Sequence, residues 1–163
     1  MTDAAARIAD HPVFAELGAA ERVLVAATAR PVRFGPGQRV FTEGAPARGC
    51  WLIQEGRVVL EADVRGRGQV VVQTLGPGDL LGWSWFAPPY RWQVTARAVS
   101  PTSAIELDTT ELRVMADQDP RFGYALARTL FAAALERLQA TRLRLIDLQP
   151  RSPYEPHGRT AER

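Results

Sequence analysis

The sequence predicts a single, mainly β domain with helices at both ends. Its 163 residues suit one domain with its own core. Between Pro31 and Asp108, short runs of alternating apolar and polar residues, rich in β-branched side chains, follow one another, separated by turn residues. This regular spacing is typical of an antiparallel sandwich or barrel. Before and after this region the apolar residues recur at helical spacing instead.

The N-terminal region is expected to contain a flexible segment followed by two short helices. Residues 1–11 form the segment that we expect to be flexible. From His11 to Arg30 the apolar side chains follow helical spacing, and Gly18 divides this stretch in two. The folded domain is therefore expected to span residues 12–148.

From Pro31 the period of the pattern changes to two, which predicts strands. The predicted strands are PVRF, QRVFTEG, CWLIQEG, RVVLEADV, QVVVQTL, WQVTARAV and SAIELD. Glycine-bearing stretches such as GPG (35–37) and GPGD (76–79) separate them. Glycine accepts the positive φ that sharp turns require, so these stretches are the expected connections.

Helical spacing returns at Asp108, where Asp108 or Thr109 can cap a first turn. Asp119-Pro120 is then expected to open a long helix that ends near Leu148, with proline in the first turn. Residues 149–163 contain three prolines and no apolar periodicity. They are expected to form a disordered tail.

Composition and motifs exclude several function classes. The single cysteine, Cys50, excludes an internal disulfide framework and a zinc site built from several thiolates. The net charge is +2, with the basic residues scattered among acids, which is weak evidence for nucleic-acid binding. Neither a signal peptide nor an apolar run of membrane-spanning length is present, so we expect a cytoplasmic protein without membrane attachment. No GxxxxGK[ST], HExxH, GxSxG or CxxC motif occurs, and we expect no enzyme.

Three segments together carry a resemblance to a known family. They are GPGQRVFTEG (35–44), CWLIQEGRVVL (50–60) and LGPGDLLG (75–82). Their turn residues, Gly44, Gly56, Gly78, Asp79 and Gly82, are spaced as in the cyclic nucleotide-binding domain. This domain is shared by bacterial catabolite activators, kinase regulatory subunits and gated channels. The resemblance covers about residues 12–148, and it implies an eight-stranded jelly roll (a double-stranded β-helix) with N-terminal helices and a long C-terminal helix.

The resemblance also implies a ligand site. In the family a phosphate-binding cassette follows the last of these glycines, and a short helix there presents backbone N–H groups to the cyclic phosphate. A glutamate directly after the glycine binds the ribose 2′-OH, and an arginine pairs with the phosphate. By resemblance the candidate cassette residues here are Gly78, Asp79, Leu80, Leu81, Gly82, Trp83, Ser84, Arg91, Trp92 and Thr95.

Two positions depart from the family pattern. Trp83 stands where the glutamate is expected, and no acid occurs between Asp79 and Glu106 to replace it. Counting back from the VTARA strand, the arginine column falls on Trp92, so Arg91 is one position off. A slip of one residue on a strand turns a side chain to the opposite face. We therefore expect a regulatory or sensor domain in which recognition of cyclic nucleotides is altered or lost.

The aromatic stretch LGWSWFAPPYRW (81–92) has three interpretations at this stage. The tryptophans can fill the pocket, which leaves no room for a small ligand. The pocket can instead survive with Arg91 or Arg97 binding a cyclic nucleotide or another anionic or planar small molecule. In the third interpretation residues 83–92 are exposed and form the contact patch of a scaffold or adaptor module.

The predicted long helix carries two apolar stripes, and one domain buries only one face of such a helix. One stripe contains Phe122, Leu126, Leu130, Ala133 and Ala134; the other contains Tyr124, Phe131, Leu135, Leu138 and Leu145. We expect a homodimer through Phe131, Leu135, Leu138 and Leu145, as the family's equivalent helix implies; the alternative is a helix packed only on its own domain. Only 15 residues follow Leu148, too few for the helix-turn-helix domain of the family's activators. Direct DNA binding is therefore not expected, whereas an unidentified protein partner is a further expectation.

Overall fold

The computed structural model describes residues 3–148, with side chains for residues 4–143. Eight strands form two four-stranded antiparallel sheets, ordered β1-β8-β3-β6 and β2-β7-β4-β5. The strands are β1 (Ala29–Phe34), β2 (Arg39–Phe41), β3 (Cys50–Glu55), β4 (Val58–Val64), β5 (Gly68–Leu75), β6 (Leu80–Leu81), β7 (Thr95–Ala98) and β8 (Thr102–Leu107). The predicted eight-stranded jelly roll is confirmed.

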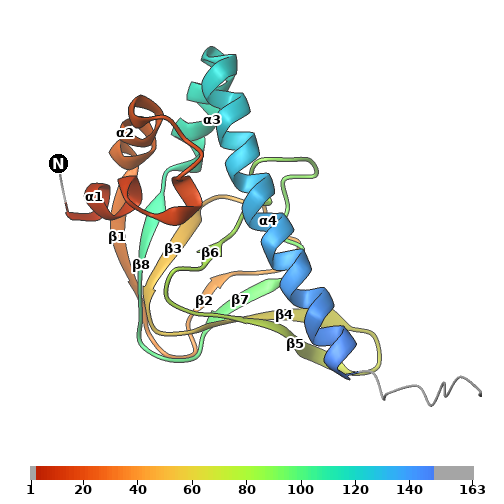
Figure 1. Cartoon of the computed structure of the whole chain (residues 1–163). Helices are drawn as coiled ribbons and strands as arrows, with labels where there is room; N and C mark the ends of the chain where they lie inside the picture. The colour runs from red at the N-terminus through yellow and green to blue at the C-terminus, as the bar shows by residue number, and fades with distance from the viewer. Residues whose placement is uncertain (1–2, 149–163) are drawn as a thin grey trace, which may run out of the picture.

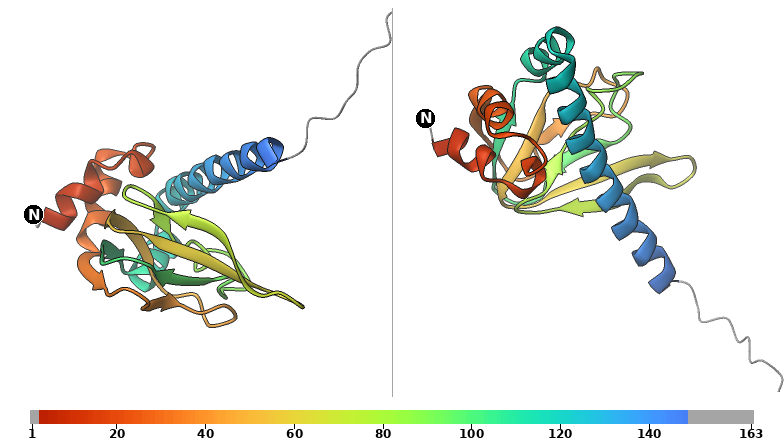
Figure 2. Two further views of the ribbon diagram at one scale, coloured as in Figure 1. Left: turned by 90° about the horizontal axis from the view of Figure 1, so that it is seen from below. Right: turned by 45° about the horizontal axis from the view of Figure 1, so that its top comes forward.

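Helices stand before and after the roll, as predicted. They are α1 (Asp3–Ala9), the 3-10 helix η1 (Pro12–Phe14), α2 (Ala19–Ala27), α3 (Thr109–Gln118) and α4 (Pro120–Leu148). Figure 1 shows α4 running across the roll from α3 toward the β4–β5 hairpin. Figure 2 shows the N-terminal helices and α4 on one side of the sheets. None of the described helices is long and apolar enough to cross a membrane.

The N-terminal segment differs from the expectation. Residues 3–9 form a helix, and Ala4, Ala5 and Ile8 are buried in the core. Alanine is the strongest helix former, and Ile8 anchors this short helix to the domain. The expected flexibility of residues 1–11 is therefore wrong for α1.

His11 connects α1 to η1. Its Nδ1 accepts a hydrogen bond from the backbone N–H of Val13 at 3.2 Å and so caps η1. Its ring also meets that of Phe14 edge-on, with 6.4 Å between the ring centroids. Partial burial lowers the pKa of His11 below its usual value, because the protonated ring loses water. The folded protein therefore favours neutral His11.

Strand boundaries differ slightly from the sequence-based prediction. β1 begins at Ala29, two residues before the expected Pro31, and pairs with β8 along its whole length. β6 contains only Leu80 and Leu81 and was absent from the predicted runs. Two residues are too few to show alternation, and both leucines are buried because β6 pairs with β3.

The C-terminal helices begin where the sequence predicted. Asp108 caps α3, because its Oδ1 accepts from the N–H groups of Thr110 at 2.9 Å and Glu111 at 3.1 Å. α4 starts at Pro120 and ends at Leu148. Phe122, Leu126 and Leu130 are buried against the domain. The expected tail, residues 149–163, lies outside the described residues.

The other stripe of α4 faces outward. Tyr124 and Phe131 are each 68% exposed, and Leu135 and Leu138 are also exposed. The side chain of Leu145 lies outside the described part of the structure. One stripe of α4 thus packs on its own domain, while the second has no cover within the described chain.

Candidate functional site

Within the candidate cassette the chain turns at Gly82, a position that strongly favours glycine. Gly82 follows β6 with a φ of +86°, and a Cβ added there would lie 3.0 Å from the ring of Trp92. Both the positive φ and the close ring favour glycine at this position. The turn therefore brings the chain tightly against the roll and starts the aromatic stretch.

Trp92 fills the interior of the roll. It is 4% exposed, and its ring stacks on that of Phe41 with 3.8 Å between centroids and 12° between planes. Trp51 lies 6.1 Å from Trp92 and 5.8 Å from Phe41 by ring centroids. Backbone bonds hold the segment in place: the Trp92 N–H donates to Ala45 O at 3.0 Å, and the Gly44 N–H donates to Trp92 O at 2.8 Å. The three rings join both sheets.

The other aromatic residues of the stretch take different places. Trp85 is 1% exposed and meets Phe86 edge-on. Trp83 is only half-buried, and Tyr90 is exposed under the guanidinium of Arg113, 4.5 Å from its ring centroid. The filling of the interior therefore belongs to Trp85 and Trp92. Residues 87–91 stay exposed between these two buried rings.

Arg91 and Arg97, the two arginines that the sequence suggested as anion-binding residues, make contacts outside the candidate cavity. Arg91 is exposed, and its Nη1 donates to Gly44 O at 2.7 Å. Arg97 forms an ion pair with the buried Glu61. This pair lowers the pKa of Glu61, chiefly through the hydrogen bond from Arg97. Neither arginine lines the cavity described next.

A cavity of about 250 Å³ lies between the candidate cassette, β2, β4, β5 and α4. Its lining residues are Phe41, Leu60, Val72, Gln73, Leu81, Gly82, Trp83, Ser84, Trp92, Gln93, Val94 and Arg137. Five of the candidate site residues, Leu81, Gly82, Trp83, Ser84 and Trp92, thus come together around one space. Leu60 lines the cavity and pairs in register with Ala96, so the neighbouring Arg97 lies on the opposite face of the sheet.

The remaining candidate residues lie outside this lining. Asp79 stabilises its own turn, because its Oδ2 accepts from the Gly76 N–H at 2.8 Å. Gly78, with a φ of +87°, belongs to the same turn, and Leu80 is buried in β6. The Thr95 Oγ1 accepts from the Glu43 N–H at 3.0 Å. These contacts give Asp79 and Thr95 structural partners within the protein.

Arg137 of α4 is the charged residue among the lining residues that sequence reasoning missed. Its guanidinium carbon lies 4.0 Å from the centre of the Trp83 ring, and its Nη2 donates to Leu80 O. Burial lowers the pKa of Arg137 to about 10, while the charge of Asp79 acts in the opposite direction. The available signal was its position seven residues after Leu130, which continues the buried stripe of α4 with a charged residue.

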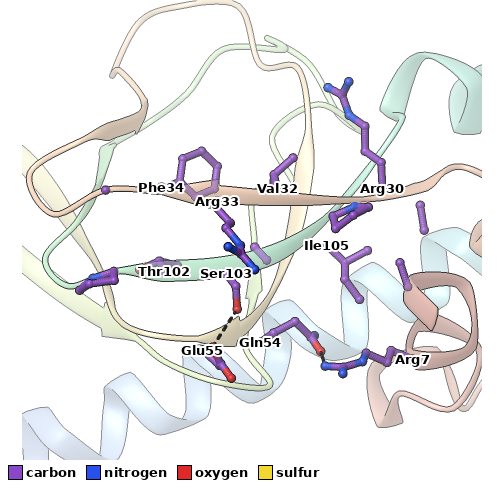
Figure 3. A pocket seen from close by; sticks show the side chains of 16 residues that line it. Arg7, Arg30, Val32, Arg33, Phe34, Gln54, Glu55, Thr102, Ser103 and Ile105 are labelled. Atoms are coloured by element: carbon purple, nitrogen blue, oxygen red, sulfur yellow. Dashed lines mark hydrogen bonds between the residues drawn. The ribbon is translucent and has the colours of Figure 1, made fainter. Parts of the chain in front are cut away.

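A larger hollow than this cavity lies at a different site. It is an open groove of about 1110 Å³ over β1 and β8, flanked by α1 (Figure 3). Arg7 there donates to Gln54 Oε1 at 3.1 Å, and Arg30 pairs with Glu106. No candidate cassette residue lines this groove. Its size reflects an uncovered sheet face, and we place the candidate site in the smaller cavity.

Two observations concern the possible metal ligands and the cysteine among the described residues. No group of three His, Cys, Asp or Glu side chains gathers within them to hold a metal ion. Cys50 is 1% exposed in β3, and burial raises the pKa of its thiol to about 12. A thiol in this state carries little thiolate at neutral pH, so it is a core residue.

Comparison with known proteins places this geometry in a family. The sequence model of the cyclic nucleotide-binding domain matches residues 31–119. A CRP-like cAMP-activated global transcriptional regulator of Mycobacterium tuberculosis is 27% identical over 119 residues, which cover 73% of this chain and 51% of the regulator. This chain thus spans about half the length of that relative.

Solved structures agree with this assignment. A protein from Geobacter metallireducens GS-15 that is described as a cyclic nucleotide-binding protein is 27% identical to this chain. Its structure superposes with a TM-score of 0.74 over 85% of this chain and 99% of that one. The Thermus thermophilus catabolite activator protein shares the fold, with 24% identity and a TM-score of 0.65 over 84% of this chain and 62% of that one. The chain belongs to the cyclic nucleotide-binding domain family.

Proposed function

We propose that this chain is a non-catalytic, cytoplasmic regulatory domain that has lost the family's usual recognition of 3′,5′-cyclic nucleotides. The observation that carries the proposal is the placement of Trp92. It stands in the column where the resemblance implies an arginine, and it is buried in a stack on Phe41. An indole in this position cannot neutralise a phosphate, and its volume occupies space that a ligand would need.

The chemistry of the cavity supports the same proposal. Trp83 stands at the position implied for the glutamate, and no carboxylate belongs to the described lining. A ribose 2′-OH would therefore lack its charged acceptor. The volume of about 250 Å³ is also below the roughly 300–1,000 Å³ of typical ligand pockets. The residues do not fit a conventionally bound cyclic nucleotide.

Titration calorimetry with cyclic AMP and cyclic GMP tests the proposal. Each lost charge-assisted hydrogen bond costs about 1.5–3 kcal/mol, which weakens binding roughly ten- to a hundredfold. With both the glutamate and the arginine replaced, we expect no binding with a Kd below about 1 µM. A cooperative thermal transition of the same sample shows that the protein is folded. Sub-micromolar binding of either nucleotide would contradict the proposal.

We further propose that the domain forms a homodimer through the outward stripe of α4. Phe131, Leu135 and Leu138 follow one another on the exposed side of this helix, beside Tyr124. Exposed apolar side chains that gather in a stripe are typical of a contact surface, because water covers them at a cost in free energy. The resemblance to a family whose equivalent helix pairs subunits supports a second copy as the partner.

A further inference from the structure

Arg137 is a partly buried cation without a carboxylate partner. Among the described residues, no Asp or Glu oxygen forms a salt bridge with its guanidinium. The carboxylate of Asp79 acts on Arg137 through its charge without a salt bridge, and its Oδ2 accepts from the Gly76 N–H instead. The thiol of Cys50 is neutral at neutral pH. Buried charges in proteins are normally paired, because an unpaired charge loses hydration without compensation. A partly buried arginine without a salt-bridge partner at the wall of a cavity therefore points to an anion from outside the chain.

The geometry leaves most of the guanidinium available. Arginine carries five N–H donors, and the protein occupies one of them through the bond to Leu80 O. The guanidinium carbon lies over the Trp83 ring, and this cation–π contact uses none of the remaining N–H donors. A planar fork of this kind matches a carboxylate, which accepts two parallel N–H bonds.

The other lining residues indicate what kind of molecule carries the anionic group. Trp83, Trp92 and Phe41 present aromatic surface, whereas Gln73, Ser84 and Gln93 are neutral hydrogen-bonding groups. One cation balances one negative charge, so a monoanion suits the cavity better than a phosphate dianion. The small volume and the aromatic walls favour a flat, largely apolar body.

We propose that Arg137 is the anion-binding residue of this cavity and that the cavity takes a small planar monoanion of the aromatic carboxylate class. This inference rests on the proposed function, because a conventionally bound cyclic nucleotide would occupy the same space. It moves the charged contact from the cassette, where the resemblance implies it, to the C-terminal helix.

The experiment uses 2-naphthoate as the probe and 2-naphthamide as its neutral counterpart of the same shape. Binding to the full chain is measured by calorimetry and by the shifts of the tryptophan indole N–H signals in NMR spectra. Saturable binding of 2-naphthoate is expected, with binding of the amide roughly ten- to a hundredfold weaker, as for loss of a charge-assisted hydrogen bond. The Trp83 indole signal is expected to shift with the naphthoate.

Variants assign the effect to the residue. Arg137→Gln is expected to weaken 2-naphthoate to the level of the amide, and Arg137→Lys to fall between, because lysine keeps the charge and loses the fork. Arg121→Gln, at an exposed position in the first turn of the same helix, serves as the matched control and should bind like the parent protein. Melting curves of all variants show that each is folded.

The outcomes separate the two proposals. Equal binding of the acid and the amide, or unchanged binding in folded Arg137→Gln and Arg137→Lys, would overturn the role of Arg137. Failure of both 2-naphthoate and the smaller benzoate to bind at millimolar concentration, together with absent cyclic nucleotide binding, would overturn the ligand class and leave the proposed function standing. Tight cyclic AMP binding would instead overturn the proposed function itself.

Discussion

Replacement of Trp92 by alanine is the most direct perturbation of the filled interior. The indole stacks on Phe41 of one sheet and lies beside Trp51 of the other. Truncation therefore removes contacts to both sheets at once. It also joins the vacated space to the existing cavity, which Trp92 already lines.

The expected loss of stability follows from the burial of this side chain. A tryptophan buries about 150–250 Å², which at about 25 cal/mol per Å² corresponds to about 4–6 kcal/mol. Measured Trp→Ala substitutions in cores cost about 3–5 kcal/mol, and an aromatic pair contributes about 0.5–1.5 kcal/mol beyond its area. Because Trp92 is 4% exposed, we expect the full cost of about 3–5 kcal/mol. A domain is stable by only about 5–15 kcal/mol, so this is a large share.

Urea denaturation followed by far-ultraviolet circular dichroism measures the effect. With a slope of about 2 kcal/mol per M, a loss of about 4 kcal/mol lowers the midpoint by about 2 M. Trp83→Ala is the matched control, because the same side chain is only half-buried there and should cost clearly less. A midpoint lowered by less than about 0.5 M in Trp92→Ala would refute the reasoning, since it would mean that the indole contributes no core packing.

Two further predictions concern α4 and His11. Light scattering should give twice the chain mass for the parent protein and the single chain mass for Phe131→Glu. Val23→Glu on α2 replaces an exposed valine outside the stripe and should stay dimeric. A parent protein that is monomeric at high concentration would contradict the dimer. Because the pKa of His11 is lowered on folding, its contribution to stability is complete above the unfolded value of about 6.5 and is lost as the pH falls below it. His11→Asn keeps a capping oxygen and does not titrate, so melting temperatures between pH 7.5 and 5 should fall more steeply for the parent protein, and equal slopes would exclude this role for His11.

Most of the fold could be predicted because its signals are local. Alternation marks the longer strands, glycines mark the turns, and Pro120 marks the start of α4. α1 was missed because its seven residues include four alanines, which carry little periodicity, and because this short helix is held by packing on α2 and β1. Whether such a short segment forms a helix depends on tertiary packing, which the local sequence pattern indicates only weakly.

The residues that the cassette contributes to the candidate site could be predicted from the sequence, whereas the residue that α4 contributes could not. Trp83 and Trp92 were identified as replacements by counting along a continuous motif. Arg137 was not, because only the folded structure brings α4 over Trp83. Likewise, the half-buried state of Trp83 and the full burial of Trp85 depend on which distant elements pack on each ring, which a local pattern does not show.

The position of Cys50 makes this protein its own reporter of opening motions. Alkylating reagents attack the thiolate, and the native state offers almost none, since the sulfur is buried and the pKa of the thiol is about 12. Modification at neutral pH must therefore wait for a fluctuation that uncovers β3. The rate of labelling then follows the free energy of that opening when reclosure is fast, and the rate of opening itself when labelling is faster. With only one cysteine in the chain, such an experiment reads the exposure of a single strand at the centre of the β1-β8-β3-β6 sheet.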